Sequence, residues 1–381
     1  MFYGFISVGS LHPYAAFHQH TCTFYLKSRQ KFVNYQIFSL FLGDIKMQTS
    51  AITKRTMKHS INDLREMFES YLAQIEVPAE PERLYTPFIY SMSGGGKRLR
   101  PALLLAAYNV FADDIATAMP AATAIEVFHN FTLLHDDIMD NAVMRRGRKS
   151  VYAKWGVNVA LLSGDAMLIA AYRMLRKSPA ESLPRILDIF NTMALQVCEG
   201  QQYDMDFESA RKISVVDYMH MIELKTAVLL AGATTIGAVL GGASDDDCRK
   251  LHRFALELGM AFQLQDDLLD CYGDTRTLGK RIGGDILEGK KTFLAVKAMS
   301  LADEPDREIL RSTYRDKNLT DDEKIARVLD LYNRLDIPRQ TEQQISIRFE
   351  RALTQLETLS VGAEATKELS DFAKSLMGRK K

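Results

Sequence analysis

The chain has 381 residues, and its 48 lysine and arginine side chains are balanced by 48 aspartate and glutamate side chains. This neutrality argues against a nucleic-acid partner or a charged membrane surface, and the length suits one large helical domain as well as two smaller domains. The cysteines, Cys22, Cys198, Cys248 and Cys271, lie far apart without a C-x-x-C pair, which argues against a zinc site and favours a reduced, cytoplasmic setting.

The first 46 residues differ in composition from the rest of the chain. They are rich in Phe, Tyr and His and carry four basic residues against one acid. They match neither a secretory signal peptide nor an Arg- and Ser-rich transit peptide. We expect residues 1–46 to be a disordered extension or no part of the working protein, and residues 57–381 to form the functional domain. An unrecognised targeting segment is the alternative.

Most of the remaining chain follows a helical pattern. From Ile61 to Ile75 the apolar residues fall on one stripe, which the prolines of residues 77–82 end. Similar stripes continue along the chain, and no alternating run is strong enough for a strand. The most apolar stretch, residues 227–243, is shorter than the roughly 20 residues needed to cross a bilayer. We predict an all-α fold with this stretch as a buried central helix and no integral membrane segment.

A glycine-rich stretch, GGGKRLRP, occupies residues 94–101. It is not a P-loop, because Ser91 stands where the first glycine would be and Arg98 stands where Ser or Thr would follow the lysine. The flexible glycines precede Lys97, Arg98 and Arg100, and Pro101 follows at an expected first helical position. Backbone N–H groups and cationic side chains would converge on an anion there. A basic loop at a helix start is the alternative.

Two acidic motifs with D-D-x-x-D spacing end apolar runs. They consist of Asp136, Asp137 and Asp140, and of Asp266, Asp267 and Asp270. Because a helix advances about 100° per residue, the first and last carboxylates of each motif project from nearly one face. One such motif is more often a solvated helix face, but two behind apolar runs indicate a metal site. Mg²⁺ takes one or two carboxylates plus substrate phosphates, so the pair fits a diphosphate bridged by metals better than a calcium cage.

Together these motifs make the chain resemble the trans-isoprenyl diphosphate synthases of the polyprenyl synthetase family. The matching segments follow the family's order: GGGKRLRP at 94–101, HNFTLLHDDIMD with RRG at 129–147, GQQYD at 200–204, KT at 225–226, FQLQDDLLD at 262–270 and GKRIGGDILEGKKT at 279–292. The resemblance implies a single-domain isoprenoid-synthase-type helical bundle around a deep central cavity, working as a homodimer. It also implies Mg²⁺-dependent condensation of isopentenyl diphosphate with an allylic diphosphate (dimethylallyl, geranyl or farnesyl), with three Mg²⁺ ions per active site.

The resemblance also assigns roles to individual residues. The direct metal ligands would be Asp136, Asp140 and Asp266, with Asp137, Asp267 and Asp270 acting through metal-bound water. Isopentenyl diphosphate would be held by Lys97, Arg100, His129 and Arg146, and the allylic diphosphate by Arg145, Lys225, Lys280 and Lys290. Thr226 and Gln263 would flank the nascent cation with oxygen dipoles and, with Lys225 and Arg145, form the catalytic set. Gln201 and Asp204 would support an arginine or a metal-bound water.

Product length depends on side chains below the first acidic motif. In the family, a bulky aromatic residue at this depth goes with short products, and Phe131 lies five residues before Asp136, beside the small Thr132 and one turn above Phe128. We expect an all-trans C20 product, geranylgeranyl diphosphate, with farnesyl diphosphate (C15) as the close alternative. A class I terpene cyclase would replace the second motif with an Asn/Ser-rich triad. A noncatalytic partner subunit would have eroded motifs.

Overall fold

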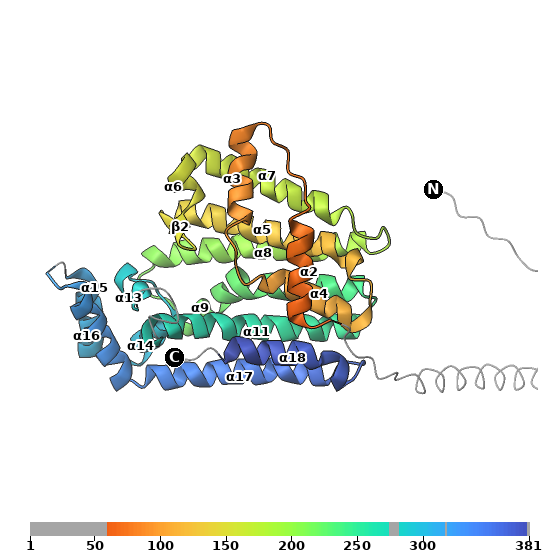
Figure 1. Cartoon of the computed structure of the whole chain (residues 1–381). Coiled ribbons are helices and arrows are strands. Elements are labelled where there is room, and N and C mark those ends of the chain that lie inside the picture. Colours follow the sequence, from red (N-terminus) through yellow and green to blue (C-terminus); the bar gives the residue numbers. More distant parts are fainter. Residues whose placement is uncertain (1–58, 274–281, 317, 379–381) are drawn as a thin grey trace, which may run out of the picture. The chain divides into compact units, whose positions relative to one another are not determined.

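The computed structural model describes residues 59–273, 282–316 and 318–378, and in this part the protein is almost entirely helical (Figure 1). The extension expected at residues 1–46 lies outside these ranges. The N-terminal helices are α2 (Ile61–Leu72), α3 (Glu82–Met92), α4 (Leu99–Phe111), α5 (Met119–Met139), α6 (Val151–Trp155), α7 (Val157–Leu175) and α8 (Leu183–Ser209), with a 3₁₀ turn at Ile115–Ala118. The all-α prediction is confirmed.

The chain continues through a second group of helices. They are α9 (Val215–Ile222), a π-helical turn (Glu223–Ala227), α10 (Val228–Leu240), α11 (Asp245–Tyr272), α13 (Gly284–Glu288), α14 (Phe293–Leu301), α15 (Glu304–Arg315), α16 (Asp321–Arg334), α17 (Ile337–Glu357) and α18 (Ala363–Met377). Helices α13 to α16 gather at one end of the long helices α11 and α17 (Figure 1).

The helix ends follow local signals in the sequence. Helix α2 begins after Ser60, whose hydroxyl accepts a hydrogen bond from Asp63 N–H while the Asp63 carboxylate accepts one from the Ser60 backbone. Helix α11 begins after Ser244, whose hydroxyl accepts from Asp247 N–H. The stripe predicted from residue 61 to 75 ends at Leu72, three residues early. Capping therefore fixes helix starts more sharply than apolar periodicity fixes helix ends.

Helix α10 is the centre of the main core, as predicted for residues 227–243. Every residue of α10 except Leu240 is buried, and it packs against α4, α8 and α11. A Cβ on Gly237 would lie 2.0 Å from the Leu104 carbonyl oxygen of α4, so this close approach requires glycine. The continuous stretch Val215–Leu240 is long and apolar enough to cross a membrane, but 83% of its most apolar window is buried inside the protein. It is a core helix.

A short hairpin interrupts the helices directly after the first acidic motif. Strands β1 (Met144–Arg145) and β2 (Arg148–Lys149) pair antiparallel, with Met144 opposite Lys149 and Arg145 opposite Arg148. The left-handed backbone of Arg146 and Gly147, with φ of 53° and 74°, makes the turn between them. The hairpin folds the RRG segment back over the end of α5.

Candidate active site

The first acidic motif lies at the C-terminal end of α5, where the hairpin returns Arg145 to it. Arg145 Nε donates to Asp137 Oδ1 at 2.7 Å, and its Nη2 donates to Asp136 Oδ2 at 3.2 Å. Burial raises the pKa of Asp137, and the Arg145 guanidinium opposes this shift. Arg145 is thus held across two carboxylates at the place where the sequence predicted a diphosphate ligand.

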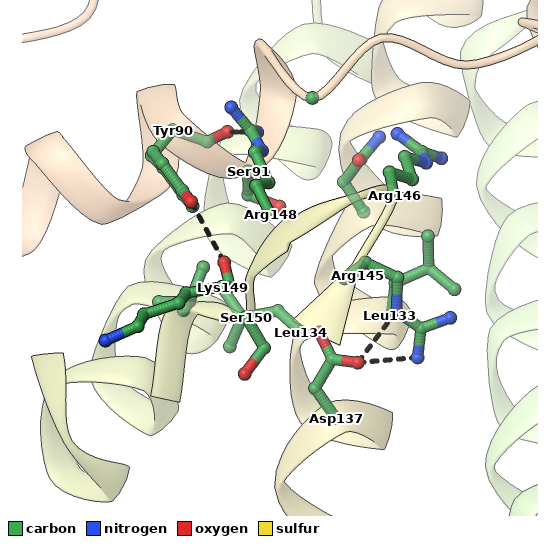
Figure 2. Close-up of a pocket in the computed structure, with 13 residues that line it drawn as sticks. Tyr90, Ser91, Leu133, Leu134, Asp137, Arg145, Arg146, Arg148, Lys149 and Ser150 are labelled. Carbon is green, nitrogen blue, oxygen red and sulfur yellow. Dashed lines mark hydrogen bonds and ion pairs between the residues drawn. The ribbon is translucent and has the colours of Figure 1, made fainter. Parts of the chain in front are cut away.

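A small cavity lies behind this motif. Its lining includes Leu134, Asp137, Arg145, Arg146 and Arg148, and Figure 2 shows Asp137 bound to Arg145 at its edge. The cavity has a volume of about 30 Å³, comparable to the share of liquid volume of one water molecule. A diphosphate is much larger than this cavity and does not fit in it.

The hairpin is also fastened to α3. The Arg148 guanidinium lies 3.9 Å from the centre of the Tyr90 ring and donates to the Tyr90 carbonyl oxygen. The Tyr90 hydroxyl donates to the carbonyl oxygen of Lys149 at 2.9 Å (Figure 2). These contacts fasten strand β2, which pairs with the strand that carries Arg145, to α3.

The π-helical turn brings Lys225 to the first motif. Lys225 Nζ is ion-paired with Asp204 Oδ2 of α8 and lies 3.5 Å from Asp136 Oδ1. Burial lowers the pKa of Lys225, but Asp136 and Asp204 outweigh this and raise it overall, so the ammonium stays charged. A Cβ on Gly200 would lie 2.2 Å from the Lys225 backbone nitrogen, so α8 can approach the turn only at a glycine. Asp204 therefore supports a lysine, where the sequence suggested an arginine or a metal-bound water.

The second acidic motif lies on α11, and its carboxylates differ in burial. Gln263, Asp266 and Asp270 are half-buried, whereas Asp267 is only 4% exposed. Asp267 accepts hydrogen bonds from the Tyr218 hydroxyl, from Gln263 Nε2 at 3.0 Å and from Phe293 N–H at 3.1 Å. Burial raises the pKa of Asp267 to about 7 against these three donors. Both of its oxygens are thus engaged by the protein, and its predicted action through a metal-bound water stays a prediction.

The two residues expected beside the cation also meet. Thr226 follows Lys225 in the π-helical turn, and its hydroxyl donates to Gln263 Oε1 of α11 at 3.0 Å. The turn thereby connects three helices, because Lys225 contacts carboxylates of α5 and α8 while Thr226 contacts α11.

Two cationic side chains at the glycine-rich loop point in different directions, one toward solvent and one into the protein. Lys97 is exposed, but Arg98 turns inward with a left-handed φ of 45°. Its Nη1 lies 2.5 Å from Glu126 Oε1 of α5 and its Nε lies 2.7 Å from Glu69 Oε1 of α2. The sequence grouped Arg98 with Lys97 and Arg100 as an anion ligand. This grouping was wrong for Arg98, because its guanidinium is ion-paired with the buried Glu126 carboxylate.

The other predicted ligands of isopentenyl diphosphate gather near this loop. Arg100 Nη1 lies 3.1 Å from His129 Nε2, and Arg146 donates to the Gly95 carbonyl oxygen. Burial lowers the pKa of His129 well below its usual range, and the charges of Arg100 and Arg146 lower it further. His129 is therefore neutral, and its Nε2 accepts the Arg100 hydrogen bond. The site offers an anion two guanidinium groups and the nearby ammonium of Lys97.

Of the two lysines predicted to bind the allylic diphosphate beyond the second motif, Lys290 lies within the described residues. Lys290 is half-exposed, and its Nζ lies 3.0 Å from Glu288 Oε2 and 4.0 Å from Asp285 Oδ1. Asp285 N–H in turn donates to Asp270 Oδ2 at 2.9 Å, which ties this segment to α11. Lys280 lies outside the described residues.

The carboxylates fit a divalent metal that brings part of its own ligand shell. Asp136 Oδ1 is buried and accepts no hydrogen bond from any described residue. The pKa of Asp140 is raised, first by loss of solvent and then by the negative charge of Asp136. A cation between them would relieve this repulsion. In the described ranges, no group of three or more His, Cys, Asp or Glu side chains is arranged to hold a metal ion by itself.

An aromatic cluster lies below the first motif. The Phe131 ring centre is 4.7 Å from that of His135 and 5.6 Å from that of Phe128, which also contacts Phe190 at 5.2 Å. Phe128 is buried in the core, whereas Phe131 keeps some exposure. The Thr132 hydroxyl donates to the His129 carbonyl oxygen of its own helix. Of the three predicted chain-length residues, Phe128 is thus buried, while Phe131 and Thr132 keep some exposure.

Comparisons with known proteins agree with this geometry. The sequence model of one family, described as polyprenyl synthetase, matches residues 81–332. The chain is 42% identical over 220 residues to a geranylgeranyl diphosphate synthase of Methanosarcina mazei, covering 57% of this chain and 68% of that protein. It is 37% identical over 260 residues to a geranylfarnesyl diphosphate synthase of Natronomonas pharaonis, covering 64% and 76%. It also resembles a crystal structure of a geranylgeranyl pyrophosphate synthase with a TM-score of 0.81 and 41% identity, covering 85% of this chain and all of that one.

Proposed function

Because the chain belongs to the polyprenyl synthetase family and is a trans-prenyltransferase, we propose that it condenses isopentenyl diphosphate with allylic diphosphates to give geranylgeranyl diphosphate. The observation that carries the proposal is that the π-helical turn contacts residues of both acidic motif helices. There Lys225 lies beside Asp136 of the first motif, and Thr226 contacts Gln263, one turn from Asp266 and Asp267 of the second. Cations, carboxylates and oxygen dipoles are the groups that ionisation of an allylic diphosphate requires, since the negative charge develops on phosphate oxygens.

The chain's own residues perform most of the steps. Arg145 and Lys225 give up part of their pairing with Asp136 and donate hydrogen bonds to the oxygens of the allylic diphosphate. These hydrogen bonds strengthen as the C–O bond breaks, because negative charge develops on the diphosphate oxygens. Three Mg²⁺ ions, held by Asp136, Asp140 and Asp266, would neutralise charge on the departing diphosphate. Thr226 and Gln263 present oxygen atoms toward the positive carbon.

The second substrate is held by the loop before α4. Lys97, Arg100 and Arg146 bind isopentenyl diphosphate, and neutral His129 keeps Arg100 in place through its Nε2. The double bond of isopentenyl diphosphate attacks the allylic cation, and the proton then lost passes to the departing diphosphate. Binding both diphosphates to fixed cations brings the two reacting carbons together, which removes most of the entropy cost of their encounter.

The product length is proposed from Phe131 and from the relatives. In this proposal the partly exposed Phe131 ring stops the growing chain below the first motif, and a geranylgeranyl diphosphate synthase is among the similar proteins. Incubation of the purified chain with isopentenyl diphosphate, Mg²⁺ and labelled dimethylallyl, geranyl or farnesyl diphosphate, followed by chromatography, should give a C20 diphosphate. A C15 end product would replace the proposal with a farnesyl diphosphate synthase. A cyclic hydrocarbon or no product would refute it.

We also propose a homodimer that works in the cytoplasm. Helix α7 exposes Leu162 and Ile169, and the neighbouring helix α8 exposes Leu195, so these two helices present apolar side chains that a second copy would cover. Light scattering should give twice the 43.0 kDa chain mass. Ile169→Glu should produce monomers, while Val216→Glu, at an exposed apolar residue of α9, should not. The cytoplasmic location is supported by the free thiols of Cys198, Cys248 and Cys271.

A further inference from the structure

A buried chain of hydrogen bonds leads from Tyr218 to the proposed cation site. The Tyr218 hydroxyl of α9 and the Phe293 N–H of α14 both donate to Asp267 Oδ2, and Gln263 Nε2 donates to Asp267 Oδ1 at 3.0 Å. Gln263 Oε1 then accepts from Thr226 Oγ1 at 3.0 Å. The chain therefore joins three helices and the π-helical turn through one carboxylate.

The chemistry of the carboxylate fixes the orientation of the Gln263 amide. Asp267 Oδ2 accepts from the Tyr218 hydroxyl and from Phe293 N–H, and its Oδ1 accepts from Gln263 Nε2. With both carboxylate oxygens accepting, the Gln263 amide presents its NH₂ group to Asp267 and its oxygen to Thr226. Without Asp267 the amide could rotate by half a turn and place its N–H bonds beside the reacting carbon. Those bonds carry the positive end of the amide dipole and would oppose a developing cation.

The burial of Asp267 separates it from the other acids of its motif. Asp266 and Asp270 are half-buried, whereas Asp267 is 4% exposed and contacts Tyr218 and the start of α14. We propose that Asp267 and Tyr218 are positioning residues, which hold the Gln263 oxygen toward the reacting carbon and take no part in binding the metal. This inference rests on the proposed prenyl transfer.

The first test compares the Mg²⁺ dependence of two matched variants. Asp267→Asn keeps the side-chain shape, but the new amide no longer determines which end of the Gln263 amide faces it, so the Gln263 amide can rotate. The single-turnover rate should therefore fall by about tenfold to a hundredfold. The Mg²⁺ concentration for half-maximal rate should stay within about twofold of the parent's, because no metal ligand is lost. Asp266→Asn, at a proposed direct ligand, should raise that concentration. If Asp267→Asn raises it as much as Asp266→Asn does, Asp267 belongs to the metal site and the inference is wrong.

The second test is a double-mutant cycle with Tyr218→Phe and Gln263→Ala. Tyr218→Phe removes one hydrogen-bond donor and should lower the single-turnover rate several-fold without changing the Michaelis constant for isopentenyl diphosphate. In the Gln263→Ala background the same substitution should have no further effect, because the group being positioned is gone. An equal loss in both backgrounds, or no loss in the parent, would overturn the proposal.

Two controls keep the outcomes apart. If Tyr218→Phe lowers the thermal unfolding temperature too far for kinetics, the isosteric Asp267→Asn variant tests the same chain of hydrogen bonds. The parent enzyme is assayed first with geranyl and isopentenyl diphosphates. A parent without prenyl transfer contradicts the proposed function, whereas an active parent with an additive cycle contradicts only the positioning role.

Discussion

The buried ion pair beneath the glycine-rich loop makes a stability prediction that can be worked from the structure. The Arg98 and Glu126 side chains are 5% and 3% exposed, and their charged atoms lie 2.5 Å apart. Glu126→Gln keeps the shape of the side chain and leaves a nearly buried guanidinium with Glu69 as its remaining carboxylate. Removing one partner of a buried pair costs about 3–5 kcal/mol, and the lower value applies because the Glu69 pair persists.

The matched control is Glu69→Gln. Glu69 pairs with the same guanidinium at 2.7 Å, but its side chain is 50% exposed, so its loss should cost about 1 kcal/mol or less. With an unfolding entropy that scales with chain length, about 3 kcal/mol lowers Tm by about 4 °C in a chain of this size. Calorimetry at one protein concentration should therefore show a fall of about 4 °C for Glu126→Gln and about 1 °C for Glu69→Gln. Equal falls, or a larger one for Glu69→Gln, would show that the buried pair does not hold the loop.

Three further substitutions test the site itself. Asp136→Ala should lower turnover by 10²-fold or more while Tm changes little, since removing one preorganised charge contact typically costs that much; a rate within about threefold of the parent's would remove Asp136 from the metal set. Lys97→Ala should raise the Michaelis constant for isopentenyl diphosphate more than that for the allylic substrate. Lys225→Ala should raise the Michaelis constant for the allylic substrate more, or lower turnover. Equal effects of a substitution on both substrates would contradict the assignment of two separate diphosphate sites. Phe131→Ala should extend the product beyond C20, whereas Phe128→Ala, at a buried position, should mainly lower stability by about 3–5 kcal/mol; an unchanged product distribution for Phe131→Ala would make this ring core packing.

Short-range patterns in the sequence predicted much of this molecule. The most apolar stretch of the sequence located the buried helix α10. The spacing of Asp136 and Asp140 placed them on one face because a helix repeats every 3.6 residues. These features depend on residues a few positions apart, so one sequence is enough to find them.

Features that depend on distant partners were not predictable in this way. Arg98 is one of three neighbouring cations, and only the fold shows that Glu126, 28 residues away, lies beneath it. Tyr218 occupies an ordinary apolar stripe, and its bond to Asp267 spans 49 residues. The separation of Asp267 from Asp266 and Asp270 had a weak local signal, since adjacent helical residues differ by about 100° in direction. Which side is buried depends on α9 and α14.

The π-helical turn also sets the angular phase between the two halves of one long helical rod. An extra residue in a helical turn rotates everything beyond it by about 100° relative to an uninterrupted α-helix. Before the turn, Tyr218 joins a cluster with Leu264 and Phe293, and after it α10 faces α4. Deleting one residue between positions 223 and 227 would therefore swing Tyr218 away from Asp267 or turn α10 in the core. Because an insertion or deletion changes this rotation only in whole-residue steps, no small adjustment of it is possible. The contact of Tyr218 with its cluster and the contact of α10 with α4 therefore both require the present number of residues in the turn.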